Sequence, residues 1–267
     1  CIPGLMEYNH AKIQVLDVPG IVEGAATGRG RGKEVLACAQ SADLVIILLD
    51  VFAPEHFEVV KNEIHETGLR INQKPPQVKI SKKLRGGIDI GTTIRLTKIN
   101  EETITVILKE FRLDNCSIVI REDITDEQLI DVIEGNKKYV PAITVLNKID
   151  MVDKKELERI KSIIKPDICI SADKKINTEE LKNLVFKKLE FIRVFCKEVG
   201  KKADMGVPLI MRKGNRLSDV CSKLHKDFVN RFKFVRIWGK SVKFPGMVLR
   251  KLEHVVEDND IVEIHLS

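Results

Sequence analysis

The stretch Lys12-Ile13-Gln14-Val15-Leu16-Asp17-Val18-Pro19-Gly20 decides the fold of this chain. Its apolar residues predict a buried strand that brings Asp17 to the carboxyl edge of a sheet. A turn is predicted before this strand, at residues 7–9, so that two short strands form a hairpin. Pro19 and Gly20 predict a sharp turn after the strand. Because ligands of open parallel α/β sheets bind outside the carboxyl ends of the strands, we expect Asp17 to face a ligand.

A carboxylate in this place can hold a phosphate-bound Mg²⁺. The sequence matches the Asp-x-x-Gly element of P-loop nucleotidases, in which the aspartate helps to hold the metal. We therefore predict that Asp17 binds Mg²⁺ through a water molecule and that Pro19 and Gly20 line a nucleotide site. An ordinary turn has the same Asp-x-Pro-Gly pattern, so this interpretation depends on motifs further along the chain.

The residues after this turn, 24–32, include four glycines in nine positions. Such a run fits either a phosphate cradle or a segment that orders around a nucleotide. A cradle of the type Gly-x-x-x-x-Gly-Lys-Ser/Thr is excluded, because the residues at positions 27 and 34 are Thr and Glu. Gly239-Lys240-Ser241 fails the same test, since Phe234 occupies the first glycine position. The 267 residues therefore contain no phosphate loop.

Apolar runs and helical patterns alternate along much of the chain. Residues 42–50 have the pattern of a central parallel strand, and residues 55–66 have apolar positions at helical spacing. Strands are predicted again at 140–146 and 167–170. An amphipathic helix then begins at Thr178, with an apolar face made of Leu181, Leu184, Val185, Leu189 and Ile192. This order predicts an α/β fold with a doubly wound sheet.

The middle of the chain interrupts this pattern. A capping-box sequence from Thr125 to Gln128 opens a helix that Gly135 ends. A helix at 100–111 and a strand at 117–120 are predicted before it. We interpret this region as an inserted α+β domain.

A third domain is predicted after the Gly-Lys-Lys sequence at 200–202. It combines a helix with strands, at 207–211 (strand), 216–229 (helix), 235–238 (strand) and 261–266 (strand). The predicted domain ranges are 1–75 and 142–202 for the α/β domain, 76–141 for the insertion and 203–267 for the C-terminal domain.

The sequence Asn147-Lys148-Ile149-Asp150 follows a predicted strand and has a specific use there. The Asp150 carboxylate can accept two hydrogen bonds from the ring N–H and the exocyclic amine of guanine, whereas adenine offers no such pair of donors. Asn147 can tie the loop to the base, and the Lys148 stem can pack over the ring. Downstream, Ser171-Ala172 follows another strand and is predicted to offer backbone N–H groups to the guanine carbonyl. Together with Asp17, these motifs predict a GTP-binding site.

The composition is that of an ordinary globular protein, with 43% hydrophobic and 31% charged residues. The formal charge of +6 is compatible with nucleic-acid binding. The longest apolar run, residues 44–49, is too short to cross a bilayer, and we expect no membrane partner. Six scattered cysteines without a Cys-x-x-Cys pair predict reduced thiols and a cytoplasmic location.

Four stretches resemble the Obg-related developmentally regulated GTP-binding (DRG) family. They are residues 17–26, the run Gly28-Arg29-Gly30-Arg31-Gly32, Asn147-Lys148-Ile149-Asp150 and residues 257–262. The resemblance covers essentially the whole chain. It implies a P-loop-NTPase-type doubly wound sheet, an inserted domain and a C-terminal β-grasp domain of the TGS type. It also implies a phosphate loop upstream of Cys1, so we expect this sequence, which does not begin with Met, to be a fragment with an incomplete sheet.

The function implied by the resemblance is hydrolysis of GTP to GDP with Mg²⁺ by a cytoplasmic protein that associates with ribosomes, assisted by a DRG-type regulatory protein. Ile21 stands where Ras-like GTPases place a water-orienting glutamine, so a potassium-assisted or ribosome-stimulated route is implied and no catalytic residue is assigned. Basic residues of the last domain, represented by Lys223, Arg236 and Lys240, predict contact with ribosomal RNA. The alternative is a non-catalytic RNA- or ribosome-binding adaptor with a decayed nucleotide site.

Overall fold

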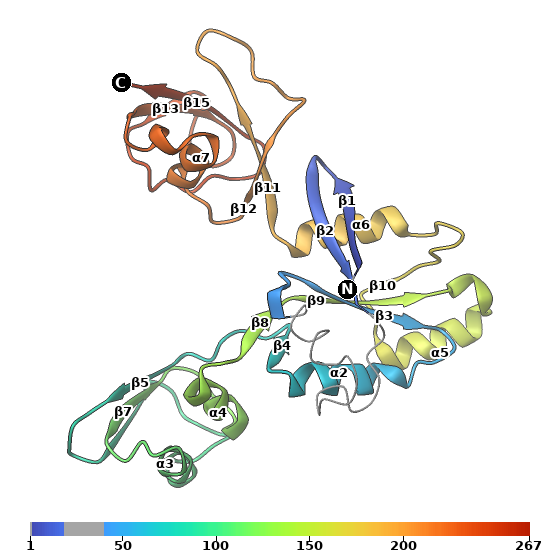
Figure 1. Cartoon of the computed structure of the whole chain (residues 1–267), viewed down its shortest axis with the longest axis vertical. Coiled ribbons are helices and arrows are strands. Elements are labelled where there is room, and N and C mark those ends of the chain that lie inside the picture. The colour runs from blue at the N-terminus through green and yellow to red at the C-terminus, as the bar shows by residue number, and fades with distance from the viewer. Residues whose placement is uncertain (1, 19–39) are drawn as a thin grey trace. The chain divides into compact units, whose positions relative to one another are not determined.

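The computed structural model describes residues 2–18 and 40–267 (Figure 1). The chain divides into two units, which are described separately below. The first comprises residues 1–19, 50–52 and 143–267, and the second comprises residues 20–49 and 53–142. The glycine-rich run, Ile21 and two predicted site residues, Pro19 and Gly20, lie outside the described part of the chain.

In the first unit, the predicted N-terminal hairpin forms, with its turn at residues 9–10 instead of 7–9. The prediction that its second strand is a buried strand of the α/β sheet is wrong, because among the described residues the two strands form a sheet of their own and Val15 is 38% exposed. Strand β1 (Ile2–Tyr8) pairs antiparallel with β2 (Ala11–Asp17), and the register places Tyr8 opposite Ala11. Asn9 and His10 form the turn with positive φ angles of 47° and 65°. This backbone conformation suits a two-residue hairpin turn, whose twist matches that of the strands.

Strand β9 (Ala142–Asn147) is the buried strand from which the candidate site extends. It pairs in parallel with β10 (Ile168–Cys169). Its first five residues are all buried, as expected for a strand covered on both faces. A 3₁₀ turn η1 (Ile149–Met151) and helix α5 (Lys154–Ile164) follow β9, and helix α6 (Thr178–Lys188) follows β10. The predicted α/β class is therefore confirmed.

Strand β3 (Val45–Asp50), which falls almost wholly in the second unit, is less covered than its apolar sequence suggested. Ile47 and Leu49 are buried, but Ile46 is 38% exposed and Leu48 is 60% exposed. Successive side chains of a strand point to opposite faces, so one face of β3 is packed and the other is open to solvent.

The predicted apolar face of helix α6 extended too far. The helix ends at Lys188, and Glu190 adopts a positive φ of 53° that no helix continues through. Ile192 therefore lies in strand β11 (Phe191–Cys196) and packs in the core of the C-terminal domain. The spacing from Leu189 to Ile192 fits a helix, but the chain has already turned into a strand. The sheet of the C-terminal domain thus begins upstream of the predicted boundary at residue 203.

The C-terminal domain is a mixed sheet covered on one face by a helix. Its strand order is β12-β11-β15-β13-β14, in which β11 and β15 run parallel and the other neighbours are antiparallel. The further elements are β12 (Leu209–Arg212), α7 (Leu217–Leu224), η2 (Lys226–Phe228), β13 (Phe232–Trp238), β14 (Met247–Leu249) and β15 (Asp260–Leu266). Leu217 and Val220 of α7 pack against Val235 and Ile237 of β13. This arrangement is the predicted β-grasp type, and the short edge strand β14 was not predicted.

The second unit contains helix α2 (His56–Glu66) and the inserted domain. Strands β4 (Leu69–Ile71) and β8 (Lys138–Val140) pair in parallel where the chain leaves for the insertion and returns from it. The inserted domain has a three-stranded sheet in the order β5-β7-β6 and two helices. Its elements are β5 (Val78–Lys82), β6 (Ile88–Thr92), α3 (Glu101–Glu110), β7 (Cys116–Ile120) and α4 (Asp126–Glu134).

The inserted domain is the predicted α+β arrangement with its own core. That core includes Ile104, Leu108, Ile118 and Leu129, all with no exposed surface. The capping box predicted at Thr125 and Gln128 is present, and helix α4 ends at Gly135 in the left-handed conformation. Strands β5 and β6 were not predicted, because basic residues and glycines surround their few apolar positions.

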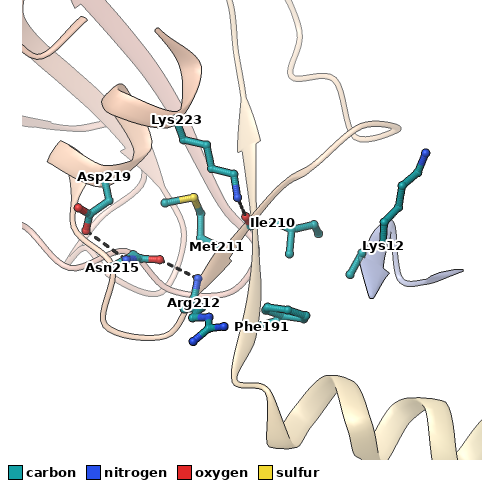
Figure 2. Close-up of a pocket in the computed structure, with 9 residues that line it drawn as sticks. Lys12, Phe191, Ile210, Met211, Arg212, Asn215, Asp219 and Lys223 are labelled. Atoms are coloured by element: carbon teal, nitrogen blue, oxygen red, sulfur yellow. Dashed lines mark hydrogen bonds between the residues drawn. The ribbon is translucent and has the colours of Figure 1, made fainter. Parts of the chain in front are cut away.

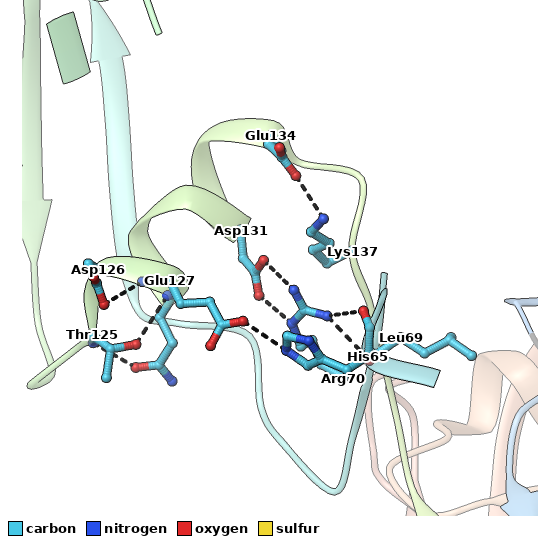
Figure 3. Close-up of polar contacts among 10 residues, drawn as sticks. His65, Leu69, Arg70, Thr125, Asp126, Glu127, Asp131, Glu134 and Lys137 are labelled. Atoms are coloured by element: carbon cyan, nitrogen blue, oxygen red, sulfur yellow. Dashed lines mark hydrogen bonds and ion pairs between the residues drawn. The ribbon is translucent and has the colours of Figure 1, made fainter. Parts of the chain in front are cut away.

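A buried ion pair joins helix α4 to strand β4 (Figure 3). Arg70 Nε and Nη2 donate to the two carboxylate oxygens of Asp131 at 2.6 and 2.7 Å. The side chains are only 5% and 4% exposed. Arg70 Nη1 also donates to the His65 carbonyl at 2.8 Å, and His65 Nε2 lies 2.9 Å from Glu127 Oε1. The pair therefore fixes one end of helix α4 to the strand that leads into the insertion.

We predict that Arg70→Ala destabilises the protein by about 3–5 kcal/mol, because it leaves the Asp131 carboxylate buried without a partner. Urea unfolding followed by far-UV circular dichroism measures this loss. The double variant Arg70→Met/Asp131→Leu removes both charges and should regain most of it. A loss below about 1 kcal/mol for Arg70→Ala, the range of exposed ion pairs, would show that the pair is solvated.

Candidate guanine-nucleotide site

Asn147 links the loops that follow strands β9 and β10. Its Oδ1 accepts the backbone N–H of Lys148 at 2.8 Å and that of Ala172 at 3.1 Å. The carboxyl ends of parallel neighbours meet at the same sheet edge, which is why one side chain reaches both loops. The structure thus brings together the two predicted base-reading motifs.

Lys148 is held in place by a carboxylate that the sequence interpretation did not include. Its backbone is left-handed, with φ of 65°, and its Nζ lies 2.6 Å from Asp50 Oδ2 at the end of β3. The hydrogen bond from Lys148 lowers the pKa of Asp50, and a hydrogen bond from the Phe52 N–H lowers it further. An acidic residue at the end of an apolar strand was the available signal, but the sequence alone does not show that it faces Lys148.

Asp150 is positioned as a hydrogen-bond acceptor. Its side chain is 9% exposed, and its Oδ2 lies 3.3 Å from Lys174 Nζ. A hydrogen bond from the Ser171 hydroxyl lowers the pKa of Asp150, and the Lys174 ammonium adds to the effect. The group is therefore a carboxylate at neutral pH, as guanine recognition requires. Lys174, which sequence reasoning missed, is thus the cation that lies beside this carboxylate.

Ser171 and Ala172 use their backbone N–H groups within the protein. The fully buried Ser171 donates its N–H to the Ile176 carbonyl at 3.2 Å and accepts the Lys174 N–H on its hydroxyl oxygen. The Ala172 N–H donates to Asn147 Oδ1. A guanine carbonyl would have to share or replace these bonds, so the predicted donation by this pair stays a prediction.

Asp17 lies at the carboxyl end of β2 and is exposed to solvent. A single exposed carboxylate provides one oxygen ligand of the kind Mg²⁺ takes, and Mg²⁺ normally completes its shell with waters and substrate phosphates. Among the residues that the structure describes, no three His, Cys, Asp or Glu side chains form a metal-binding group. The contact of Asp17 with Mg²⁺ therefore stays a prediction.

A separate pocket of about 480 Å³ lies in the first unit and shares no residue with the predicted nucleotide site (Figure 2). It is lined by Ala11, Lys12, Phe191, Ile210, Met211, Arg212, Asn215, Asp219 and Lys223. Lys223 Nζ donates to the Ile210 carbonyl, and Asn215 accepts the Arg212 N–H while it donates to Asp219. Its polar side chains thus serve the fold of the C-terminal domain.

The three predicted RNA-contact residues lie on different parts of the C-terminal domain. Lys223 belongs to helix α7, which covers one face of the sheet. Arg236 alternates with the buried Val235 and Ile237 along β13, so it is exposed on the opposite face. Lys240 is exposed in the loop of residues 239–246, which follows β13. The structure therefore brings Arg236 and Lys240 into one region of the domain and does not bring Lys223 with them.

Models of known families match the chain in three consecutive ranges. A "50S ribosome-binding GTPase" model matches residues 1–83, the C-terminal region of that domain matches 85–191, and a TGS domain model matches 192–266. Developmentally-regulated GTP-binding protein 1 of Xenopus laevis is 38% identical over 266 residues, which cover 98% of this chain and 72% of the relative. The chain belongs to the developmentally regulated GTP-binding family.

Two further relatives support this assignment by sequence. A GTP-binding protein of Methanocaldococcus jannaschii is 48% identical over 98% of this chain and 68% of the relative. Human developmentally-regulated GTP-binding protein 2 is 36% identical over 99% of this chain and 72% of the relative. The solved YchF GTPase of Schizosaccharomyces pombe is 13% identical, covers 96% of this chain and 80% of its own, and has a TM-score of 0.46. The TGS match begins within one residue of β11, where the C-terminal sheet starts. Across the described residues, no helix has the length and apolarity to span a membrane.

For this DRG-family chain we predict that Asp150→Asn exchanges the base preference from guanine to xanthine. The asparagine amide presents a donor where guanine requires an acceptor, whereas xanthine carries a carbonyl at that position. Ligand-observed NMR with millimolar GMP and XMP measures both affinities without depending on a phosphate loop. We expect GMP binding to weaken on the order of tenfold relative to XMP.

The matched control for this prediction is Asp153→Asn. Asp153 caps helix α5 three positions further along and accepts the Glu156 N–H at 2.8 Å. This variant removes the same charge near the site without touching the proposed base reader. An unchanged ratio of GMP to XMP affinity in Asp150→Asn would assign base recognition to another group.

Proposed function

We propose that this chain carries the base-recognition and metal-contact half of a GTPase that hydrolyses GTP to GDP with Mg²⁺ and acts at the ribosome. The observation that supports it best is the joined pair of loops at the ends of β9 and β10, with the ionised Asp150 held at the centre. Family membership supports the same activity. The family that matches residues 1–83 is one of ribosome-binding GTPases, which supports the ribosome as the site of action.

Each site residue has a distinct role in this proposal. Asp150 reads the guanine base, Asn147 holds the two loops in register, and Lys148, oriented by Asp50, covers the base plane. Asp17 contacts Mg²⁺ through water, and the metal would neutralise charge on the phosphates when nucleotide is bound. A potassium ion and a DRG-type regulatory protein are further expected participants.

A chimera tests the proposal directly. It joins the phosphate-loop segment that the family resemblance places upstream to residues 1–267, and the unmodified chain is the control. We expect release of γ-phosphate from GTP that requires Mg²⁺, is stimulated by ribosomes and shifts toward XTP in Asp150→Asn. A chimera that binds GTP tightly but releases no phosphate, with or without potassium and ribosomes, would favour the alternative of a non-catalytic ribosome-binding adaptor.

The 267-residue chain by itself is predicted to bind GTP weakly. Phosphate affinity of such proteins comes mostly from backbone amides and the lysine of the phosphate loop, which this sequence does not contain. Base contacts alone should give a Kd of about 1 mM or weaker. Isothermal titration calorimetry that finds micromolar binding would show that another part of this chain binds the phosphates.

The C-terminal domain is proposed to contact ribosomal RNA through Arg236 and Lys240. We predict that Arg236→Glu/Lys240→Glu abolishes co-sedimentation of the chain with ribosomes at moderate salt. Binding by the unaltered chain should weaken with salt, with a log–log slope of about −0.7 to −0.9 per phosphate contacted. Lys154→Glu/Lys155→Glu, which reverses two charges at an exposed pair on helix α5, serves as the control. If all three proteins sediment alike, the contact lies elsewhere, and the basic run at 79–85 of the inserted domain is the next region to alter.

A further inference from the structure

The C-terminal domain contains a long basic stretch without acidic residues. Between Asp227 and Glu253 there is no Asp or Glu. Seven basic residues lie in this interval, namely Arg231, Lys233, Arg236, Lys240, Lys243, Arg250 and Lys251. The interval comprises β13, the loop 239–246 and the edge strand β14. Its middle, the loop, has a feature that charge alone does not explain.

The start of the loop is fixed against a buried carboxylate. A Cβ atom at Gly239 would lie 2.0 Å from Asp260 Oδ1, so only glycine allows this close approach. Asp260 has no exposed surface, and its carboxylate accepts the N–H groups of Glu257 and Ser241. The Ser241 hydroxyl lies 3.0 Å from His254 Nε2. Contacts with Asp260 and His254 thus hold the backbone at the start of the loop in place.

The end of the loop is fixed against Trp238. A Cβ atom at Gly246, where φ is 77°, would lie 3.2 Å from the indole Nε1. The Gly246 N–H donates to the Ile237 carbonyl at 2.8 Å. Lys197 Nζ lies 4.7 Å from the centroid of the indole ring. Trp238 is half-buried and contacts the end of the loop at Gly246.

Between these two anchors, Val242 packs against the core of the domain, whereas three other side chains are exposed. Phe244 is 58% exposed, and Lys240 and Lys243 are exposed as well. Next to the loop, Val248 of β14 is 45% exposed and lies opposite Arg236 of β13. Burial of an aromatic ring is favourable, and the exposed ring of Phe244 does not contribute this free energy to folding. The ring and its flanking ammonium groups are thus arranged in advance for a binding partner.

We propose that loop 239–246 binds single-stranded RNA, with Phe244 stacked on an unpaired base and Lys240 and Lys243 paired with the adjoining phosphates. Every base has a π face, so stacking on an aromatic side chain requires no particular sequence. Bases within an A-form duplex are stacked on each other and cannot meet the ring. RNA is favoured over a protein partner because every charged residue of the interval 228–252 is basic, and a polyanion complements such a run.

This proposal rests on the proposed contact with ribosomal RNA and names the element and the RNA form that make it. It adds a stacking residue to a contact otherwise argued from charge alone. The contributions of stacking and of charge to the RNA affinity respond differently to salt. Loss of an uncharged ring lowers affinity equally at all salt concentrations, whereas loss of a lysine also lowers the salt slope.

Fluorescence anisotropy with the full 267-residue chain tests the proposal, using short labelled oligouridylate, oligoadenylate and a blunt RNA duplex as probes. Phe244→Leu keeps an apolar side chain but removes the π face, and Phe244→Trp restores it. Phe111→Leu, at another exposed phenylalanine in the inserted domain, is the matched control. Lys240→Gln/Lys243→Gln is compared with Lys154→Gln/Lys155→Gln, an exposed pair that loses the same charge. Thermal unfolding verifies that each variant is folded.

We expect Phe244→Leu to weaken binding of both single strands about tenfold with an unchanged salt slope. Phe244→Trp should bind at least as well as the unaltered chain, and duplex binding should not change. Lys240→Gln/Lys243→Gln should reduce the magnitude of the slope by about 1.4, and both control variants should behave like the unaltered chain.

Three results would overturn the proposal. If Phe244→Leu binds single strands normally while Arg236→Glu/Lys240→Glu abolishes binding, the loop is not a stacking element but the charge contact stands. If Phe244→Leu impairs ribosome binding without changing binding to single strands, the loop contacts a protein. If the unaltered chain binds no RNA at low salt, both this proposal and the proposed RNA contact fail.

Discussion

The geometry of the candidate nucleotide site depends on one side-chain carbonyl. Asn147 Oδ1 accepts the N–H of the next residue and that of Ala172, which lies 25 positions further along the chain in another loop. This connection places Asp150 near Ser171 and Lys174, and those neighbours keep it ionised. Without the amide, each loop would keep its own backbone bonds but would lose its position relative to the other. A base reader needs both loops, because acceptor and donor must meet the same edge of one ring.

Some residues of this candidate site could be predicted from the sequence, whereas others could not, for a physical reason. Asn147 and Asp150 follow a largely apolar strand, and a polar motif at a strand end is visible without a structure. Asp50 and Lys174 were missed because their roles are defined only by ion pairs with residues from other strands and loops. Asp17 was placed correctly at the end of its strand, yet nothing in its own stretch shows which groups would share a metal with it.

The fold was predictable where local signals agreed and less so where they conflicted. The capping box at Thr125 and the hairpin ending at Asp17 combine turn chemistry with periodicity, and both were found. At Ile192 the helical spacing was misleading, since a single left-handed residue, Glu190, changes the chain from helix to strand. Counting lysines could not separate Lys223 from Arg236, because the face of a sheet on which a residue lies is decided by strand alternation and by the helix that covers the other face.

The parallel pair β4–β8 has a consequence for how an inserted domain can be accommodated. The chain leaves through β4 and returns through β8, and Arg70 joins Asp131 at a sequence separation of 61. A disordered segment of that length would add loop-closure entropy to every contact made across it. Once the insertion is folded, its two ends lie side by side in the β4–β8 pair. The folded insertion then costs about as little loop-closure entropy as a short, stiff connection. An insertion with adjacent ends can therefore grow or diverge in sequence at little thermodynamic cost to the sheet that carries it.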